Sequence, residues 1–288
     1  MSVGIGILLA IMAMISWGIG DFLAKKAIDK IGYVKSVIIN VLAAIVPLLV
    51  YIILFPNMLP VSVGLVLITI AVAFLSTVGS FFFYRGMEKG NLSIVSPIAS
   101  SWVVIVTLSA TIIFKEVLTS FQALGILIIF AGIFLASTNL KELRRSVRRG
   151  MSKGVPEAMV SMVAWGITLT LNKPLVSMAG PIMALLLMRG GSFLFSSLWG
   201  KIKGIDFKFS NKLVLLFLII SGLLDTAGSL AYNFGITTEY VSIVSPVAAT
   251  YPAVTILLAY IFLKEKVANN QKVGIVAILI GLAIISLI

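Results

Sequence analysis

Three charged residues set in apolar stretches are the clearest candidates for chemistry in this sequence: Asp21, Arg189 and Asp225. A charge at the centre of a membrane-spanning helix costs roughly 2.5–3.5 kcal/mol, so such residues usually face a bundle interior or a wet cavity. Arg189 would suit a carboxylate on a ligand, whereas the aspartates would suit a cation or a transferable proton. Arg189 and Asp225 fall at similar depths in consecutive stretches, which predicts that they interact. Asp21 lies near the expected end of its stretch, where helix capping or contact with the membrane surface is an equal alternative.

Aromatic side chains at matching intervals are candidates for stacking on a ligand. Trp17 and Trp165 are 148 residues apart, and Trp102 and Tyr251 are 149 residues apart. Ordinary helix packing is the alternative role for each of them. Four further candidates place polar groups in or near apolar runs, where they need a partner on another helix or on a ligand: Tyr84, Asn172, Tyr232 and Asn233.

Composition limits the solvent in which these residues can be presented. Of the 288 residues, 60% are hydrophobic and 11% are charged, and the mean hydropathy is +1.16. A soluble domain carries about 25% charged residues, so most of this surface must face lipid. The chain has neither cysteine nor histidine, which excludes disulfides, Cys/His metal sites and catalytic triads that use histidine.

The net charge of +12 favours a membrane partner over a nucleic acid. The basic residues sit in short gaps between apolar runs, as expected for charges that orient helices beside an anionic bilayer. The first run, from about Val3 to Ala24, lacks a basic leader and is too long for the core of a signal peptide. It is therefore expected to be the first span.

An all-α membrane protein with ten transmembrane helices is the predicted fold. A span needs roughly 20 mostly apolar residues. The stretches that meet this requirement are 3–24, 34–55, 63–87, 92–114, 119–138, 154–177, 180–200, 212–236, 241–263 and 270–288.

The two halves of the sequence repeat each other. The string SIVSP occurs at 93–97 and again at 242–246, an offset of 149 residues. At nearly the same offset, Lys115-Glu116 returns as Lys264-Glu265, and Trp17-Gly18 returns as Trp165-Gly166. The predicted organisation is a first repeat at 1–140, a basic linker at 141–153 and a second repeat at 154–288. Each repeat holds five spans, an odd number, so the second enters the membrane from the opposite side; inverted repeats of this kind are typical of secondary transporters.

Repeated prolines and glycines have predicted mechanical roles. Pro97 and Pro246 remove a backbone donor inside a helix, which makes each a kink or a hinge candidate. The glycines of the fifth span of each half are seven residues apart and share a helix face. Such faces allow close helix contact, either between the two halves or between two protomers in a homodimer. The glycine pairs are Gly125 with Gly132 and Gly274 with Gly281.

These repeated motifs resemble the EamA domain of the drug/metabolite transporter superfamily. The resemblance rests on Trp-Gly in the first span, Ser-x-x-x-Pro in the fourth, Lys-Glu after it and the paired glycines of the fifth, and it covers both halves. The resemblance implies export or uptake of amino acids, metabolites, choline-like or drug-like compounds. The family pattern has an arginine in the second span of each repeat; Arg189 fits it, whereas its counterpart is Asn40.

A secondary transporter for a small metabolite, working by alternating access and acting as an exporter, is the predicted function. An uptake permease of the same fold and a non-transporting scaffold or sensor are the alternatives. An intramembrane enzyme would need clustered acid, base and nucleophile groups, which these stretches lack. No G-x-x-x-x-G-K-[ST] phosphate loop is present, and neither a cofactor nor a metal is expected.

Basic residues also predict orientation in the plasma membrane. We call the face with both termini side A and the opposite face side B. Loops on side B hold 19 of the 22 Lys and Arg residues. The positive-inside rule then places side B in the cytoplasm and both termini outside.

Overall fold

The structure, a computed structural model, describes residues 4–56, 61–137, 153–206, 211–263 and 269–286, and this part of the chain is helical without strands. The basic linker at 141–152 and Lys264-Glu265 lie outside the described residues. The first half contains α1 (Gly4–Ile31), α2 (Tyr33–Leu54), α3 (Val63–Lys89), α4 (Leu92–Ser100), α5 (Trp102–Ile112) and α6 (Ser120–Ser137). The second contains α8 (Val155–Ala179), α9 (Pro181–Ile202), α10 (Lys212–Thr238), α11 (Val241–Ala248), α12 (Tyr251–Leu263) and α13 (Asn269–Ser286).

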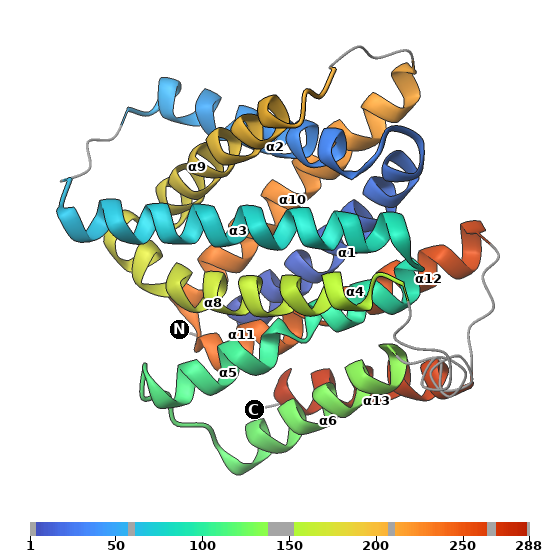
Figure 1. The fold of residues 1–288 in the computed structure, drawn as a ribbon. Helices are drawn as coiled ribbons and strands as arrows, with labels where there is room; N and C mark the ends of the chain where they lie inside the picture. Colours follow the sequence, from blue (N-terminus) through green and yellow to red (C-terminus); the bar gives the residue numbers. More distant parts are fainter. Residues whose placement is uncertain (1–3, 57–60, 138–152, 207–210, 264–268, 287–288) are drawn as a thin grey trace.

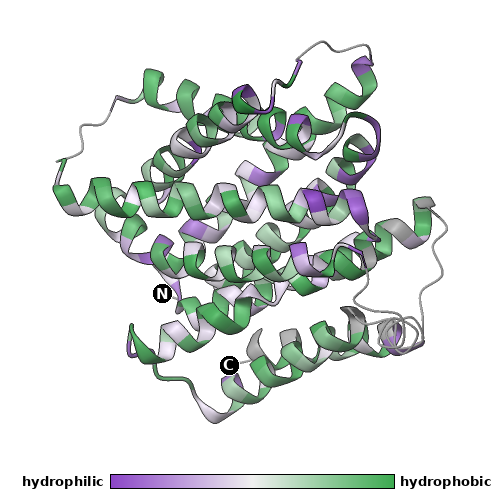
Figure 2. Cartoon of the chain, viewed as in Figure 1, coloured by the Kyte–Doolittle hydropathy of each residue, from purple (hydrophilic) through white to green (hydrophobic). Residues whose placement is uncertain are grey.

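Eight stretches of described helix are long and apolar enough to cross a bilayer. Two of them combine consecutive short helices, α4 with α5 and α11 with α12. Shorter apolar stretches lie within α6 and α13. Large apolar side chains such as Leu8, Ile53 and Leu194 are more than 60% exposed, and hydrophobic residues make up most of each helix in Figure 2. The chain is therefore a multi-pass membrane protein.

The helices alternate in direction between two ends of the bundle. The N-terminal ends of α1, α3, α9 and α11 lie at the left of Figure 1, and those of α2, α4, α8 and α10 lie at the right. The left end, which holds the start of α1, corresponds to side A, and the right end corresponds to side B. The helix ends that the sequence assigns to sides A and B therefore lie at opposite ends of the bundle.

The two halves interlock instead of forming separate domains. α1 packs along α10 and α3 packs along α8, while α2 contacts α9 and α6 contacts α13. These pairings are unchanged when each helix is exchanged for its counterpart in the other half, since α8, α9, α10 and α13 repeat α1, α2, α3 and α6. The core is consequently built from residues of both repeats, including Trp102 and Tyr232, which are almost fully buried.

Each repeated proline is followed by an interruption one turn later, where we expected one continuous span. The first break is at Ser101, where the hydroxyls of Ser100 and Ser101 both donate to the carbonyl of Pro97, at 2.9 and 3.0 Å. The second separates α11 from α12 at 249–250, where the Thr250 hydroxyl donates to the Val247 carbonyl at 2.7 Å. At both breaks a side-chain hydroxyl thus bonds to a carbonyl of the preceding helix, and the Val247 carbonyl also accepts the backbone N–H of Thr250 at 3.2 Å.

The paired glycines join α6 and α13 within one chain. A side chain at Gly132 would place its Cβ 2.8 Å from the backbone nitrogen of Ile278, and one at Gly281 would place it 2.8 Å from the carbonyl of Gly125. Both helices therefore approach backbone to backbone. These glycine faces therefore contact each other within one chain. A homodimer stays a prediction.

Candidate functional site

A cavity in the middle of the bundle brings residues of both halves together. Its volume is about 120 Å³, well above the ~10–15 Å³ that a single water needs. Helices α1, α2, α3, α5, α8, α9, α10 and α12 contribute to its wall. Eight of the residues singled out in the sequence line it: Trp17, Asp21, Tyr84, Trp102, Trp165, Arg189, Asp225 and Tyr251.

Arg189 and Asp225 form an ion pair in the cavity wall, which confirms the predicted contact. Nη2 of Arg189 lies 2.6 Å from Oδ2 of Asp225 and also donates to the hydroxyl of Ser229 at 3.2 Å. The Arg189 side chain is 6% exposed, while that of Asp225 is 29% exposed and lines the cavity. The pair holds opposite charges together in a mostly apolar setting, where either charge alone would be costly.

Asp21 stands apart from this ion pair. The sequence placed it near the end of a span, but α1 continues to Ile31, so Asp21 lies well inside the helix and does not cap it. None of the described residues donates a hydrogen bond to its carboxyl or forms an ion pair with it. Its charge interacts with that of Asp225. The cavity therefore contains one guanidinium and two carboxylates.

Asn40, the counterpart of Arg189, bridges the two halves. Its Nδ2 donates to the hydroxyl of Ser221 at 2.9 Å, and that hydroxyl donates to the carbonyl of Gly20 at 2.9 Å. The chain of hydrogen bonds links α2, α10 and α1 at the cavity wall. An amide fills this role without a charge, which accounts physically for the departure from arginine at this position.

Aromatic rings form one wall of the cavity. The ring centroid of Trp17 lies 6.4 Å from that of Trp102 and 6.1 Å from that of Tyr251, both in edge-to-face geometry. In the other half, the ring of Trp165 lies 4.9 Å from that of Phe83. The edge-to-face contacts fix the rings and leave aromatic faces available beside the carboxylates.

Each of the two equivalent tryptophans lies against a glycine of the opposite half. A Cβ at Gly228 would be 2.8 Å from Cδ1 of Trp17, and a Cβ at Gly79 would be 2.4 Å from Cδ1 of Trp165. Only a residue without a side chain allows this approach.

Three other candidate site residues do not line the cavity and instead form contacts between helices: Asn172, Tyr232 and Asn233. The Asn172 amide donates to Oδ1 of Asn233 at 2.7 Å, and the Asn233 amide donates to the carbonyl of Pro181 at 3.0 Å. The hydroxyl of Tyr232 lies 2.8 Å from that of Ser245. These contacts tie α8, α9, α10 and α11 together between the cavity and side A.

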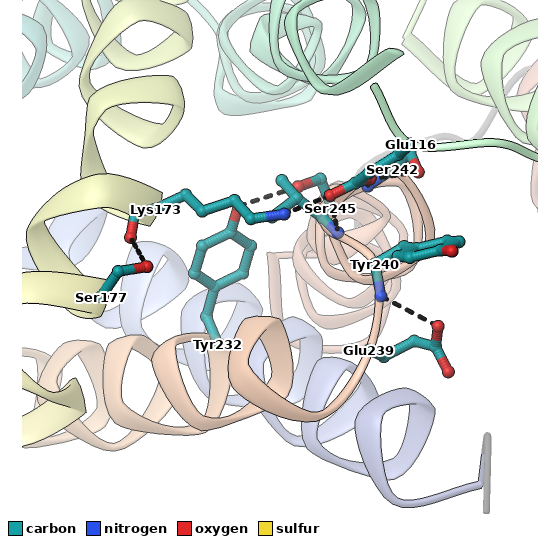
Figure 3. Close-up of polar contacts among 9 residues, drawn as sticks. Glu116, Lys173, Ser177, Tyr232, Glu239, Tyr240, Ser242 and Ser245 are labelled. Atoms are coloured by element: carbon teal, nitrogen blue, oxygen red, sulfur yellow. Dashed lines mark hydrogen bonds and ion pairs between the residues drawn. The ribbon is translucent and has the colours of Figure 1, made fainter. Parts of the chain in front are cut away.

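A cluster on side A, shown in Figure 3, joins the two halves through Glu116. We call Glu116, Lys173, Val241 and Ser242 the side A latch. Glu116 accepts hydrogen bonds from the backbone N–H groups of Val241 and Ser242 at 3.1 and 2.9 Å, and from the Ser242 hydroxyl at 2.6 Å. Lys173 of α8 forms an ion pair with the same carboxylate. Glu116 thereby caps the first N–H groups of α11, where a negative charge is favourable.

The loop after α5 positions Glu116 for this role. Lys115 has a φ of +58°, a left-handed conformation that costs a residue other than glycine roughly 1 kcal/mol. The N–H of Glu116 donates to the carbonyl of Ala110 at 3.2 Å. The turn directs the carboxylate inward, so that the Glu116 side chain is only 3% exposed.

The surroundings of Glu116 determine its charge. Burial by itself would raise the pKa of this carboxyl, but the hydrogen bonds from Lys173 and Ser242 and the positive charge of Lys173 outweigh that effect. The net pKa is below its ordinary value. Glu116 is therefore ionised at neutral pH, and the latch is complete.

A different ion cluster ties the halves at side B. Glu157 near the start of α8 lies 2.5 Å from Nζ of Lys89 and 3.7 Å from Nε of Arg85, both at the end of α3. The two basic side chains are 41% and 44% exposed. These pairs therefore contribute less per contact than the buried latch.

Comparison with known proteins shows the family. A model of the EamA-like transporter family matches residues 4–138 and again 152–287. The chain belongs to the EamA-like transporter family. Its members are transporters. Because the family model matches both halves, the resemblance to the EamA domain that the sequence indicated is confirmed in each of them.

Two similar proteins extend this assignment of an EamA-like transporter. An uncharacterized protein of Methanocaldococcus jannaschii is 29% identical over 131 residues, which are 46% of this chain and 95% of that relative. About half of this chain therefore matches nearly the full length of that relative. A protein of known crystal structure, 13% identical, superposes with a TM-score of 0.78 over 98% of this chain and 96% of its own, and shows the shared fold.

Sequence reasoning missed the latch of this EamA-like transporter. Lys115-Glu116 and Lys173 were recognised only as parts of the repeat. One available signal was the scarcity of charge on side A, where Lys115 and Lys173 are the basic residues expected from the sequence. A buried acid and a base in such a region are expected to find each other.

Proposed function

We propose that this protein is a secondary transporter that moves a small solute across the plasma membrane by alternating access. The substrate site is the central cavity, and the repeats are inverted about an axis in the membrane plane. Ten spans, with α6 and α13 as the fifth of each repeat, agree with the helix pairings between the halves. Export is the favoured direction, since the solute would enter the cavity from the side that we assign to the cytoplasm.

The position of the latch relative to the cavity carries this proposal. The cavity extends from the bundle centre toward side B, since Val37 and Tyr84, each about one turn from a side B helix end, line it. The latch and the Asn172–Asn233 bond lie between the cavity and side A. This conformer is accordingly closed toward side A. In a two-state cycle the latch opens while contacts at side B close.

A cysteine-labelling experiment tests alternating access without knowledge of the substrate. The natural chain has no cysteine, so Ser76→Cys introduces a single thiol into the cavity wall. A membrane-impermeant thiol reagent should modify it from side B. Adding Glu116→Gln should increase its modification from side A at least several-fold, because the latch is weakened.

Exposed Ser177, on side A, supplies the matched control. Ser177→Cys should react from side A with or without the Glu116 change. Equal labelling of Ser76→Cys from both faces in the parent would indicate a channel. Labelling from side B that Glu116→Gln leaves unchanged would indicate a static scaffold.

Orientation requires a separate test. The distribution of basic residues places both termini outside the cytoplasm. A C-terminal fusion to a protein that fluoresces only in the cytoplasm is expected to stay dark. A bright fusion would place side A in the cytoplasm and reverse the expected direction of transport. The alternating-access proposal would be unaffected.

A further inference from the structure

The charge balance of the cavity leaves one carboxylate without a partner. Arg189 neutralises Asp225 at 2.6 Å, whereas no described residue pairs with Asp21. Both aspartates line the same cavity. With both ionised, the cavity would hold a net charge of minus one in the middle of a membrane protein, where an uncompensated charge is costly.

Groups facing Asp21 from the surrounding helices do not supply a positive charge. Asp225 on α10 adds repulsion, and Arg189 on α9 is already paired with it. Tyr84 of α3 and Tyr251 of α12 line the same cavity, and a phenol carries no positive charge.

The two lysines of α1 nearest to Asp21 in the sequence are engaged elsewhere. Lys25 donates to Asp29 and to the carbonyl of Met87, at 2.7 and 2.6 Å. Lys26 lies over the rings of Phe22, Phe217 and Phe262, with its Nζ 4.7 Å from the Phe22 centroid. Compensation for Asp21 must therefore come from outside the described protein, as a proton or as a cation.

Aromatic walls make the cavity suited to an organic cation. Trp17 lies one helical turn before Asp21, and Trp165 and Tyr251 also line the cavity. Ring faces attract a cation through their electron-rich surface, most strongly where water is excluded. An inorganic ion would instead need several oxygen ligands, and the described residues contain no cluster of acidic side chains able to hold a metal.

We propose that Asp21 binds the ammonium group of a small organic cation, and that a proton and this cation occupy Asp21 in alternation. When the cation binds, the O–H bond of the Asp21 carboxyl breaks, one proton leaves and one positive charge replaces it. The charge of the cavity is therefore the same in both forms. Release of the cation on one side requires a proton to return to Asp21, so the transporter exchanges one proton for each monovalent cation. This deepens the proposed function and rests on it, since exchange requires the cavity to open to both sides.

Binding is measured on the purified full-length protein by tryptophan fluorescence, because three of its four tryptophans line the cavity. The probes are benzylammonium, its neutral analogue benzyl alcohol and tetramethylammonium. At least one cation is expected to bind ten or more times as tightly as benzyl alcohol at pH 8. Its affinity should fall by up to tenfold for each unit of pH lowered, as the proton competes. In weak buffer, binding should release close to one proton per protein.

Asp21→Asn should abolish the preference for cations, the pH dependence and the proton release together. Asp29→Asn is the matched control, since Asp29 lies on the same helix, 49% exposed and paired with Lys25, and should change none of them. Retention of the folded state in Asp21→Asn is checked by thermal unfolding. The proposal is overturned if the cations bind no more tightly than benzyl alcohol, or if neither cation binds. It is also overturned if Asp21→Asn keeps the cation preference, the pH dependence and the proton release of the parent.

The cysteine-labelling result separates this inference from the proposed function. Side-dependent labelling of Ser76→Cys together with absent cation binding leaves a transporter for another kind of solute. The opposite result is also informative. If Glu116→Gln leaves the labelling unchanged but cation binding is linked to a proton, the protein has a cation-binding site and does not alternate between conformers. The proposed exchange of proton for cation is then wrong.

Discussion

The indole of Trp17 lies against the bare backbone of Gly228, across the boundary between the two halves. The same relationship holds between Trp165 and Gly79. α1 with α10 and α8 with α3 are also, together with α6 and α13, the most closely associated helix pairs between the halves. Each tryptophan that lines the cavity is consequently positioned by the half to which it does not belong, so the shape of the cavity depends on how the halves pack.

Alanine at either glycine should therefore distort the cavity. Gly79→Ala and Gly228→Ala place a Cβ 2.4 and 2.8 Å from an indole carbon, and overpacking of this kind costs about 1–3 kcal/mol. We expect a lower unfolding temperature and a shifted tryptophan emission spectrum. Gly64→Ala, whose Cβ would have no neighbour closer than 3.9 Å, should leave the spectrum unchanged and stabilise α3 slightly.

Removing one member of the Arg189–Asp225 pair should be worse than removing both. Arg189→Met leaves a carboxylate unpaired in the bundle and should cost about 3–5 kcal/mol, whereas Arg189→Met with Asp225→Leu should recover much of that loss. Thermal unfolding of the singles and the double gives the coupling energy directly. Additive losses would mean that the observed contact does not stabilise the fold.

Transport should not recover with stability in that double variant. The pair forms part of the cavity wall, and apolar replacements change both its shape and its polarity. The exposed Lys25–Asp29 pair serves as a comparison, since its removal should cost under about 1 kcal/mol. Normal transport by the double variant would remove both residues from the mechanism.

Acid should weaken the side A latch. Because the pKa of Glu116 is lowered in the folded protein, its ionised form contributes stability at pH above the ordinary glutamate range, and this contribution is lost as the pH falls through the lowered value. Glu116→Gln should cost about 1.5–3 kcal/mol at pH 7, and its difference from the parent should shrink toward pH 3. Unfolding temperatures measured across this range test the expectation.

Glu239→Gln is the appropriate control for Glu116. Glu239 also lies on side A, but its carboxylate accepts a hydrogen bond from the N–H of the neighbouring Tyr240 at 2.9 Å, and an amide oxygen can accept the same bond. Its replacement should be nearly neutral at each pH. A loss of similar size in both variants would point to a general effect of charge on side A.

Pro97 and Pro246 should affect the exchange between conformers more than the folded state. Alanine at either position restores a backbone donor within α4 or α11, so the unfolding temperature should not fall. If the breaks at Ser101 and 249–250 flex during the cycle, a continuous helix should slow side A labelling of Ser76→Cys in the Glu116→Gln background several-fold. Unchanged labelling would make both breaks static bends.

The sequence was sufficient for features that follow from hydropathy and helix geometry. Apolar run lengths located the helices, and the depth of Arg189 and Asp225, at about 1.5 Å per residue, predicted their contact. Repeated motifs identified the two halves and the family. These properties are local, or depend only on distance along a single helix.

Features that depend on side-chain direction between helices could not be obtained in this way. Hydropathy does not tell which face of α8 points inward, so the sequence left Asn172 open between a partner on another helix and a ligand, and the structure shows it bonded to Asn233. The breaks after Pro97 and Pro246 depend on hydroxyls that bond to carbonyls one turn away. The sequence placed Asp21 near the end of a span because Lys25 and Lys26 follow it, but α1 continues through both. Their side chains find a carboxylate, a carbonyl and aromatic rings as partners.

The contact between α6 and α13 also gives the bundle one closely packed margin. A Cβ at Gly132 or at Gly281 would lie 2.8 Å from backbone atoms of the facing helix, and the two helices lie together at one margin of the bundle in Figure 1. Within lipid, close packing of small residues holds helices together without help from the exclusion of water. A lipid acyl chain therefore has no room between these two helices, and the bilayer meets them as a single surface.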